Sequence, residues 1–142
     1  MDKKISICTG LSSINDIDSF INAGADEFYC GVIDHVWLDN FNYIVALNRR
    51  PWPNANLNNF DELRKVVQIA HGNDCKIFYT LNEHTYTNMQ TKYIDYYLDN
   101  AIKSNVDAII FADVGLAKYC RKKYPNIAIH ISTGGIVFNR YT

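Results

Sequence analysis

A helix end, a short strand and a closing glycine follow one another in Gly24-Ala25-Asp26-Glu27-Phe28-Tyr29-Cys30-Gly31. The same order returns in Asn105-Val106-Asp107-Ala108-Ile109-Ile110-Phe111-Ala112-Asp113. Short apolar strands that each follow a helix are typical of parallel β/α proteins. In such proteins the binding and catalytic side chains gather just beyond the carboxyl ends of the strands. We therefore expect the functional residues of this chain to follow its strands.

Along the rest of the chain, short apolar runs alternate with segments of helical periodicity. This order predicts one α/β domain over residues 1–142. The predicted strands cover 5–8, 27–30, 76–81, 107–112 and 127–131. The predicted helices run from a cap at Ser12 or Ser13 to Asn22, from Asn59 to Gly72, from Thr91 to Ser104, and up to Arg121-Lys122-Lys123. Residues 31–59 form a long excursion after the second strand, with a short strand or hairpin arm at 43–47. Connections of this length are usually functional or mobile.

Two architectures fit five β/α units. One is an open doubly wound sheet, which is complete at 142 residues. The other is an arc of a (β/α)8 barrel, which normally needs about 250 residues. Chain length alone favours the open sheet.

Composition describes a soluble protein with a real core. Hydrophobic residues make up 48% of the chain and charged residues 20%, and the formal net charge is −1. This balance gives no electrostatic sign of nucleic-acid binding, although RNA is not excluded. No apolar run approaches the ~20 residues of a membrane span. The four cysteines are scattered without a Cys-x-x-Cys motif, which favours buried thiols in a cytoplasmic protein over a zinc site.

Polar residues after the predicted strands are the candidates for chemistry. In Asn82-Glu83-His84, Glu83 offers a general base and Asn82 a group that orients a substrate, while a solvated loop histidine is the simpler interpretation of His84. Asp113 offers a ligand for substrate or metal, and a helix cap is the simpler interpretation. Ser132-Thr133-Gly134-Gly135 resembles a small anion cradle, without the lysine of a P-loop.

An ordered set of blocks resembles the collagenase-like peptidase family (unassigned peptidase family 32), and the resemblance covers nearly the whole chain. The blocks are Gly24–Gly31, Arg49/Arg50 with Asn59-Phe60 to Ala70-His71, Lys76–Asn82, Val106–Leu116 and Ile129–Thr133. The resemblance implies a TIM-barrel-type fold of which this chain is the amino-terminal part, about five strands long. It reverses the argument from chain length.

The resemblance also implies a function and a set of site residues. It implies a metal-dependent peptidase, or else a non-hydrolytic member that takes part in hydroxylation of RNA or of a small aromatic acceptor. A divalent metal is the cofactor it suggests, and none of the four cysteines maps onto an iron–sulfur ligand. The catalytic candidates are Asn82, Glu83 and Asp113, and the substrate-binding candidates are Arg49, Arg50, Asn82, Ser132 and Thr133. The partner is a peptide or a small molecule, and two exposed sheet edges predict a homodimer, which leaves a non-catalytic, self-associating fragment as a third hypothesis.

Overall fold

The computed structural model describes residues 5–137, and its centre is a single five-stranded parallel sheet. The strands are β1 (Cys8–Gly10), β2 (Glu27–Cys30), β3 (Lys76–Leu81), β4 (Ala108–Phe111) and β5 (Ala128–Ile131). Every neighbouring pair is parallel, and the order across the sheet is the order along the chain. A doubly wound sheet reverses its strand order at a switch point, whereas this sheet does not reverse.

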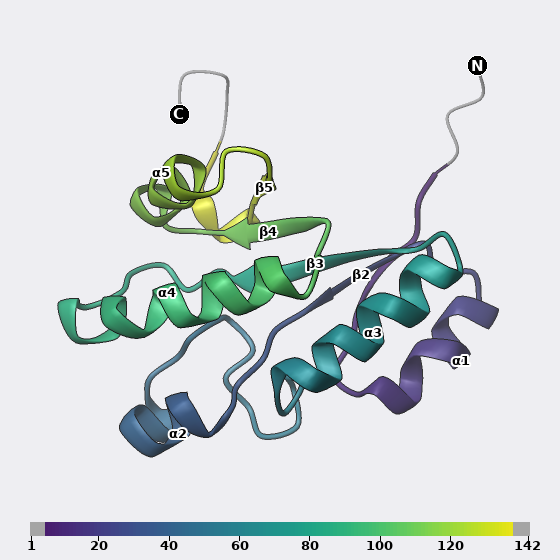
Figure 1. Ribbon diagram of the computed structural model, residues 1–142, viewed down its shortest axis with the longest axis horizontal. Coiled ribbons are helices and arrows are strands. Elements are labelled where there is room, and N and C mark those ends of the chain that lie inside the picture. The colour runs from purple at the N-terminus through teal and green to yellow at the C-terminus, as the bar shows by residue number, and fades with distance from the viewer. Residues whose placement is uncertain (1–4, 138–142) are drawn as a thin grey trace.

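Helices alternate with the strands and lie over one face of the sheet (Figure 1). They are α1 (Ile17–Asn22), α2 (His35–Phe41), α3 (Phe60–Gly72), α4 (Asn88–Lys103) and α5 (Val114–Lys123), with 3-10 turns at Ile14–Asp16 (η1), Asn42–Ile44 (η2) and Thr133–Gly135 (η3). Right-handed crossovers between sequential parallel strands place every helix on the same face. The sheet therefore has one covered and one uncovered face.

The core fills the space between the covered face and the helices. Strand residues Phe28, Ile77, Tyr79 and Ile109 are fully buried there. From the helix side, the predicted stripe of α3 meets them and is buried as expected: Leu63, Val66, Val67 and Ala70. None of the helices within residues 5–137 is long and apolar enough to cross a bilayer.

The side chains of the uncovered face belong to the strand residues that alternate with the core residues, because successive side chains of a strand point to opposite sides. Register places Tyr29, Phe78 and Ala108 in one row of this face. Thr80, Ile110 and His130 form the next row. The Phe78 and His130 rings meet edge to face with centroids 4.7 Å apart. Phe78 is only 7% exposed, although it lies on the uncovered face.

The ends of several elements differ from the sequence-based predictions. The first strand is Cys8–Gly10 instead of residues 5–8, because β2 begins at Glu27, which pairs with Cys8. Helix α4 begins at Asn88 instead of after Thr91. Its start is a capping box, in which Thr87 accepts from the Gln90 amide while the Thr87 amide donates to the Gln90 side chain, 2.6 Å away.

The excursion contains a helix that the sequence did not predict. Its residues 43–47 form no strand; η2 covers Asn42–Ile44, and α2 precedes it. Trp37 of α2 is fully buried and packs its ring on Tyr97 of α4 at a centroid distance of 5.9 Å. The Asp34 carboxylate, 3% exposed, accepts hydrogen bonds from the Tyr96 and Tyr97 hydroxyls. Tertiary contacts of this kind hold a seven-residue helix that has little stability of its own.

Candidate functional site

The uncovered face holds a cleft of about 760 Å³ that reaches the carboxyl ends of the strands. Its floor is made by side chains of the uncovered rows, among them Phe78, Thr80 and Ile110. Thr80 is 1% exposed, and its hydroxyl has no hydrogen-bond partner in the described part of the chain. The rim brings together all five predicted substrate-binding residues: Arg49, Arg50, Asn82, Ser132 and Thr133.

Arg50 fastens the rim to the sheet. Its guanidinium donates to the carbonyl oxygens of Leu11 and Tyr29, each at 3.2 Å, and to the Ser12 hydroxyl at 2.7 Å. The same guanidinium carbon lies 5.4 Å from the centroid of the Tyr29 ring. These contacts use the donors of Arg50 on the protein itself, so its side chain serves to join β1, β2 and the excursion.

Arg49 points elsewhere and has a different partner. Its Nη1 donates to His84 Nε2 at 2.6 Å. Because a guanidinium can only donate, this imidazole nitrogen is the acceptor. No carboxylate within residues 5–137 forms a salt bridge with Arg49 or Arg50.

A buried network of asparagines fixes the backbone of the two arginines. Asn48 and Asn56 bind each other at 2.8 Å; Asn48 accepts from the Arg50 amide and Asn56 donates to the Arg50 carbonyl. Both asparagine side chains are nearly inaccessible to solvent. The Arg49 amide in turn donates to Asn82 Oδ1 at 3.1 Å. The strand ends thus hold this part of the excursion at fixed positions.

Gly31 makes room for that network. A Cβ atom at position 31 would lie 2.3 Å from Asn48 Nδ2 and 2.5 Å from Asn56 Oδ1. The glycine that closes the decisive stretch of sequence therefore permits side chains of the excursion to pack against the end of β2.

Ser132 completes the rim from the end of β5. Its hydroxyl oxygen accepts from Asn82 Nδ2 at 3.5 Å and from the Gly134 amide at 3.3 Å. The Ser132 amide donates to Phe111 and the Gly135 amide to the Ser132 carbonyl. Three amides of this turn are therefore used within the protein, and the anion cradle expected from Ser132–Gly135 is largely occupied by its own hydrogen bonds.

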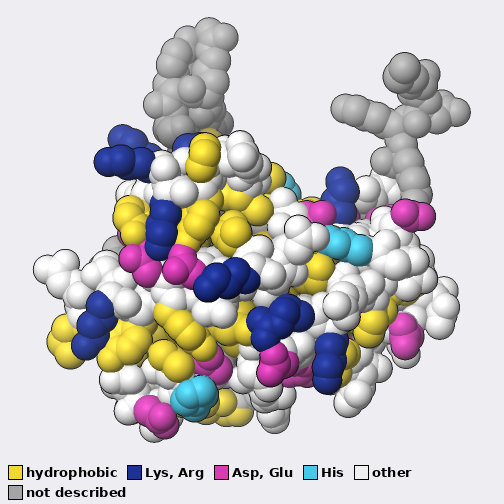
Figure 2. All heavy atoms as spheres, viewed as in Figure 1, with side chains coloured by type: hydrophobic (Ala, Val, Ile, Leu, Met, Phe, Trp, Pro, Cys, Tyr) yellow, Lys and Arg dark blue, Asp and Glu magenta, His cyan; other side chains and the backbone are white. Residues whose placement is uncertain are grey.

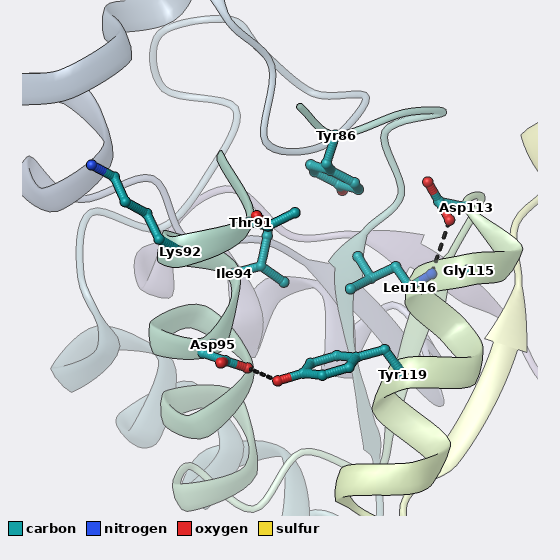
Figure 3. A pocket seen from close by; sticks show the side chains of 9 residues that line it. All are labelled: Tyr86, Thr91, Lys92, Ile94, Asp95, Asp113, Gly115, Leu116 and Tyr119. Atoms are coloured by element: carbon teal, nitrogen blue, oxygen red, sulfur yellow. Dashed lines mark hydrogen bonds between the residues drawn. The ribbon is translucent and has the colours of Figure 1, made fainter. Parts of the chain in front are cut away.

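Two predicted catalytic candidates lie outside this cleft. The Asp113 carboxylate accepts from the Leu116 amide at 2.9 Å and caps α5, the simpler of the two sequence interpretations. Figure 3 shows it in a separate pocket between α4 and α5, where the Tyr119 hydroxyl reaches Asp95. The Glu83 carboxylate accepts from the next amide, that of His84, at 2.8 Å.

Sequence reasoning missed several residues of the cleft. The alternation of Phe78, Thr80 and Asn82 along β3 could have identified Thr80 as a floor residue. Asn48 and Asn56 carried no signal, because irregular segments have no periodicity. His84 was expected to be solvated and is exposed, although it holds Arg49.

On the helix side, basic and acidic side chains are interspersed (Figure 2). In the described residues no three His, Cys, Asp or Glu side chains are grouped as metal ligands. Cys30 is fully buried, and burial raises the pKa of its thiol to about 12, so it is not a reactive cysteine.

Comparison with known proteins places the chain in a family. The model of peptidase family U32 matches residues 12–141. The chain belongs to peptidase family U32. The resemblance noted in the sequence is thereby confirmed at the level of the family.

A solved structure shares the fold of this family member. The chain is similar to the U32 peptidase Mk0906, with a TM-score of 0.59 and 14% identity over 93% of this chain. The match spans about half of that protein, 51% of its length. No curated protein matches the chain. At this identity the likeness concerns the fold, and it agrees with the predicted parallel α/β architecture.

Proposed function

We propose that this U32 family chain supplies the substrate-binding part of a peptidase-type hydrolase, with a peptide lying across the uncovered face. The observation that carries the proposal is the convergence of polar side chains from separate segments on the rim of one cleft. They come from the excursion, from the end of β3 and from the end of β5: Arg49, Asn82 and Ser132. A floor with apolar side chains and a polar rim suits a peptide that needs both burial and orientation.

The five-stranded sheet is, in this proposal, an arc of a (β/α) barrel. Its sequential strand order and its one-sided helices support that view. The cleft would then lie at the carboxyl-end mouth of the barrel, where active sites of this architecture are built. A cytoplasmic location is part of the same proposal, and four free thiols suit a reducing compartment.

The divalent metal implied by the family resemblance does not fit the described residues. The rim offers guanidinium, amide and hydroxyl groups, whereas Mg²⁺ prefers carboxylate oxygens and Zn²⁺ prefers thiolate and imidazole. Cys8, Glu27 and His130 also line the cleft, but no three such side chains within residues 5–137 are grouped to hold a metal ion. The proposal therefore assigns the rim to binding and orientation of the substrate, and no step of it passes through a metal.

Gelatin is the substrate with which to test the proposal. We expect the chain to bind gelatin and to cleave it, and Asn82→Ala to weaken both, since Asn82 bridges Arg49 and Ser132. Asn40→Ala, on α2, is the matched control. The assay is run with and without added divalent metals and a chelator, and absence of cleavage under every condition would overturn the hydrolase proposal.

A non-hydrolytic function is the second candidate. It is favoured by Arg49 of the rim, which pairs with no carboxylate in the described residues, because a free guanidinium suits an acidic small molecule or an RNA backbone. Native mass spectrometry of the purified chain separates the candidates. A copurified small acid without gelatin cleavage would favour this second function.

A further inference from the structure

Arg49, Ser132 and Gly134 meet at one point of the rim, although they come from distant parts of the sequence. Position 134 lies against the Arg49 guanidinium, since a Cβ built on Gly134 would be 2.8 Å from Arg49 Nη1. The Gly134 amide lies 3.3 Å from Ser132 Oγ. Asn82 bridges the same two residues, with Oδ1 on the Arg49 amide and Nδ2 on the Ser132 hydroxyl.

Both groups have donors left over. Among residues 5–137 Arg49 makes one side-chain hydrogen bond, through Nη1 to His84, and its other guanidinium donors have no partner there. Ser132 Oγ already accepts two hydrogen bonds, and its own proton has no acceptor among residues 5–137. A cation and a hydroxyl group therefore face one cleft, and both have hydrogen-bond donors without an acceptor in the described residues.

The positions of these donors are fixed in advance by the protein. Asn48 and Asn56 hold the Arg50 backbone from both sides, and Asn82 holds the Arg49 amide. Preorganised donors bind an anion with little loss of conformational entropy. The His84 ring also holds the Arg49 side chain, and it does so without pairing a carboxylate with the guanidinium.

The number of donors selects the kind of anion. Phosphate sites usually present several free backbone amides, whereas the Ser132, Gly134 and Gly135 amides of this turn all donate within the protein. A guanidinium fork and one hydroxyl match the two oxygens of a carboxylate. Two acidic groups lie in the surroundings. Glu27 also lines the cleft but lies at the opposite end of β2, roughly 10 Å along the strand, and the Glu83 carboxylate accepts from its own loop.

We propose that Arg49 and Ser132 form a binding site for a carboxylate of a peptide, either the free chain terminus or an acidic side chain. The proposal rests on the proposed function for the peptide nature of the ligand. Gly134 is a positioning residue of the site, because the absent side chain leaves the space that the Arg49 guanidinium occupies.

Titration of the full chain with N-acetylglycine, followed by NMR, tests the site. N-acetylglycinamide is the uncharged control, and N-acetylaspartic acid 1-amide offers only a side-chain carboxylate, so the two carboxylate ligands distinguish the sources. We expect both carboxylates, or one of them, to bind and the amide not to bind. Equal binding of N-acetylglycinamide, or preferred binding of inorganic phosphate, would overturn the proposal.

Variants tie the binding to the named residues. Loss of a charged hydrogen bond predicts that Arg49→Gln weakens N-acetylglycine binding about tenfold or more. Arg64→Gln, on α3, removes the same charge away from the cleft and is expected to leave binding unchanged. Gly134→Ala keeps every charge and displaces the flexible end of Arg49, so it should weaken binding while the chain stays folded.

Three outcomes of these measurements are decisive. Equal losses in Arg49→Gln and Arg64→Gln would mean general charge screening and would overturn the site, as would unchanged binding in Arg49→Gln. Carboxylate binding that persists while gelatin is never cleaved would leave the site standing and refute the hydrolase, so the two proposals fail separately.

Discussion

The two faces of the sheet are built from the same strands and have different surroundings. Ile109 and Ile110 are neighbours on β4, yet Ile109 is fully buried against the helices and Ile110 lines the open cleft. On the covered face, apolar side chains are buried against the helices. On the uncovered face, apolar and polar side chains share a concave surface that ends in cationic and amide groups. Stability is concentrated on one face and binding capacity on the other.

The largest expected effect concerns the whole molecule, since both edge strands expose apolar side chains. Ile7 beside β1 is 54% exposed and Ile131 of β5 is 43% exposed. Unpaired edges with apolar residues invite association. We propose that two copies associate through these edges, and we expect a dimer mass by light scattering across a concentration series.

Two matched variants show whether association depends on the edge strands or on exposed apolar side chains in general. Ile131→Asp should give a monomer, whereas Ile44→Asp, at a position 89% exposed on the excursion, should leave the mass unchanged. A monomer mass for the unaltered chain at every concentration would refute the proposal.

Truncation of the two neighbouring isoleucines should lower the free energy of unfolding by different amounts on the two faces. Ile109→Ala removes a fully buried side chain and is expected to cost about 3 kcal/mol in the free energy of unfolding. Ile110→Ala should cost about 1 kcal/mol, because its side chain is already partly in contact with solvent. Chemical denaturation measures both, and equal losses would mean that the second face is also covered in solution.

Gly31→Ala should disturb the packing of the excursion against the end of β2. The new methyl group would overlap the buried Asn48–Asn56 pair, at an expected cost of about 2 kcal/mol. Gly72→Ala is the control, since nothing lies within 4 Å of a Cβ there, and it should change stability little. Thermal unfolding compares the two, and a neutral Gly31→Ala would contradict the described packing.

The smallest effect concerns the contact between α4 and α5 on the helix side. Hydrogen bonds from Tyr119 and Lys123 lower the pKa of the Asp95 carboxyl. A lowered pKa contributes stability above the unfolded value of about 4, and the contribution disappears as pH falls through the folded value. Asp95→Asn should therefore be less stable than the unaltered chain by about 0.5 kcal/mol at neutral pH, and the difference should close in acid.

The control for this pH dependence is Asp39→Asn, which removes a carboxylate from the exposed side of α2. We expect it to follow the acid profile of the unaltered chain. Parallel profiles for Asp95→Asn and the unaltered chain in chemical denaturation would show that Asp95 contributes nothing specific.

The sequence predicted regular elements better than it predicted their contacts. Strands β2 and β3 and the Asn59 cap of α3 were placed correctly, because apolar runs and capping residues are local signals. Helix α2 was missed because Trp37 is held by Tyr97, sixty residues away. The capping box of α4 was a local signal that was overlooked, in Thr87 and Gln90.

For the site, the sequence indicated which strand ends matter and could not assign partners. Arg49, Arg50, Asn82, Ser132 and Thr133 do share one cleft, since parallel strands carry their ends to the same edge. The sequence did not distinguish the two adjacent arginines, because their separation depends on the Leu11 and Tyr29 carbonyls and on His84. Such contacts across the fold leave no trace in periodicity.

The hydrogen bond between Asn48 and Asn56 has a practical consequence for protein engineering. It closes the excursion below a short tip, residues 51–55, whose Trp52 is 68% exposed. Everything that anchors the arginines lies outside this tip: the Asn48 and Asn56 side chains and the Arg50 backbone. The tip is thus a natural place to graft an epitope or a fluorescent label beside the cleft, where the inserted segment would report on ligand arrival without replacing any group that receives it.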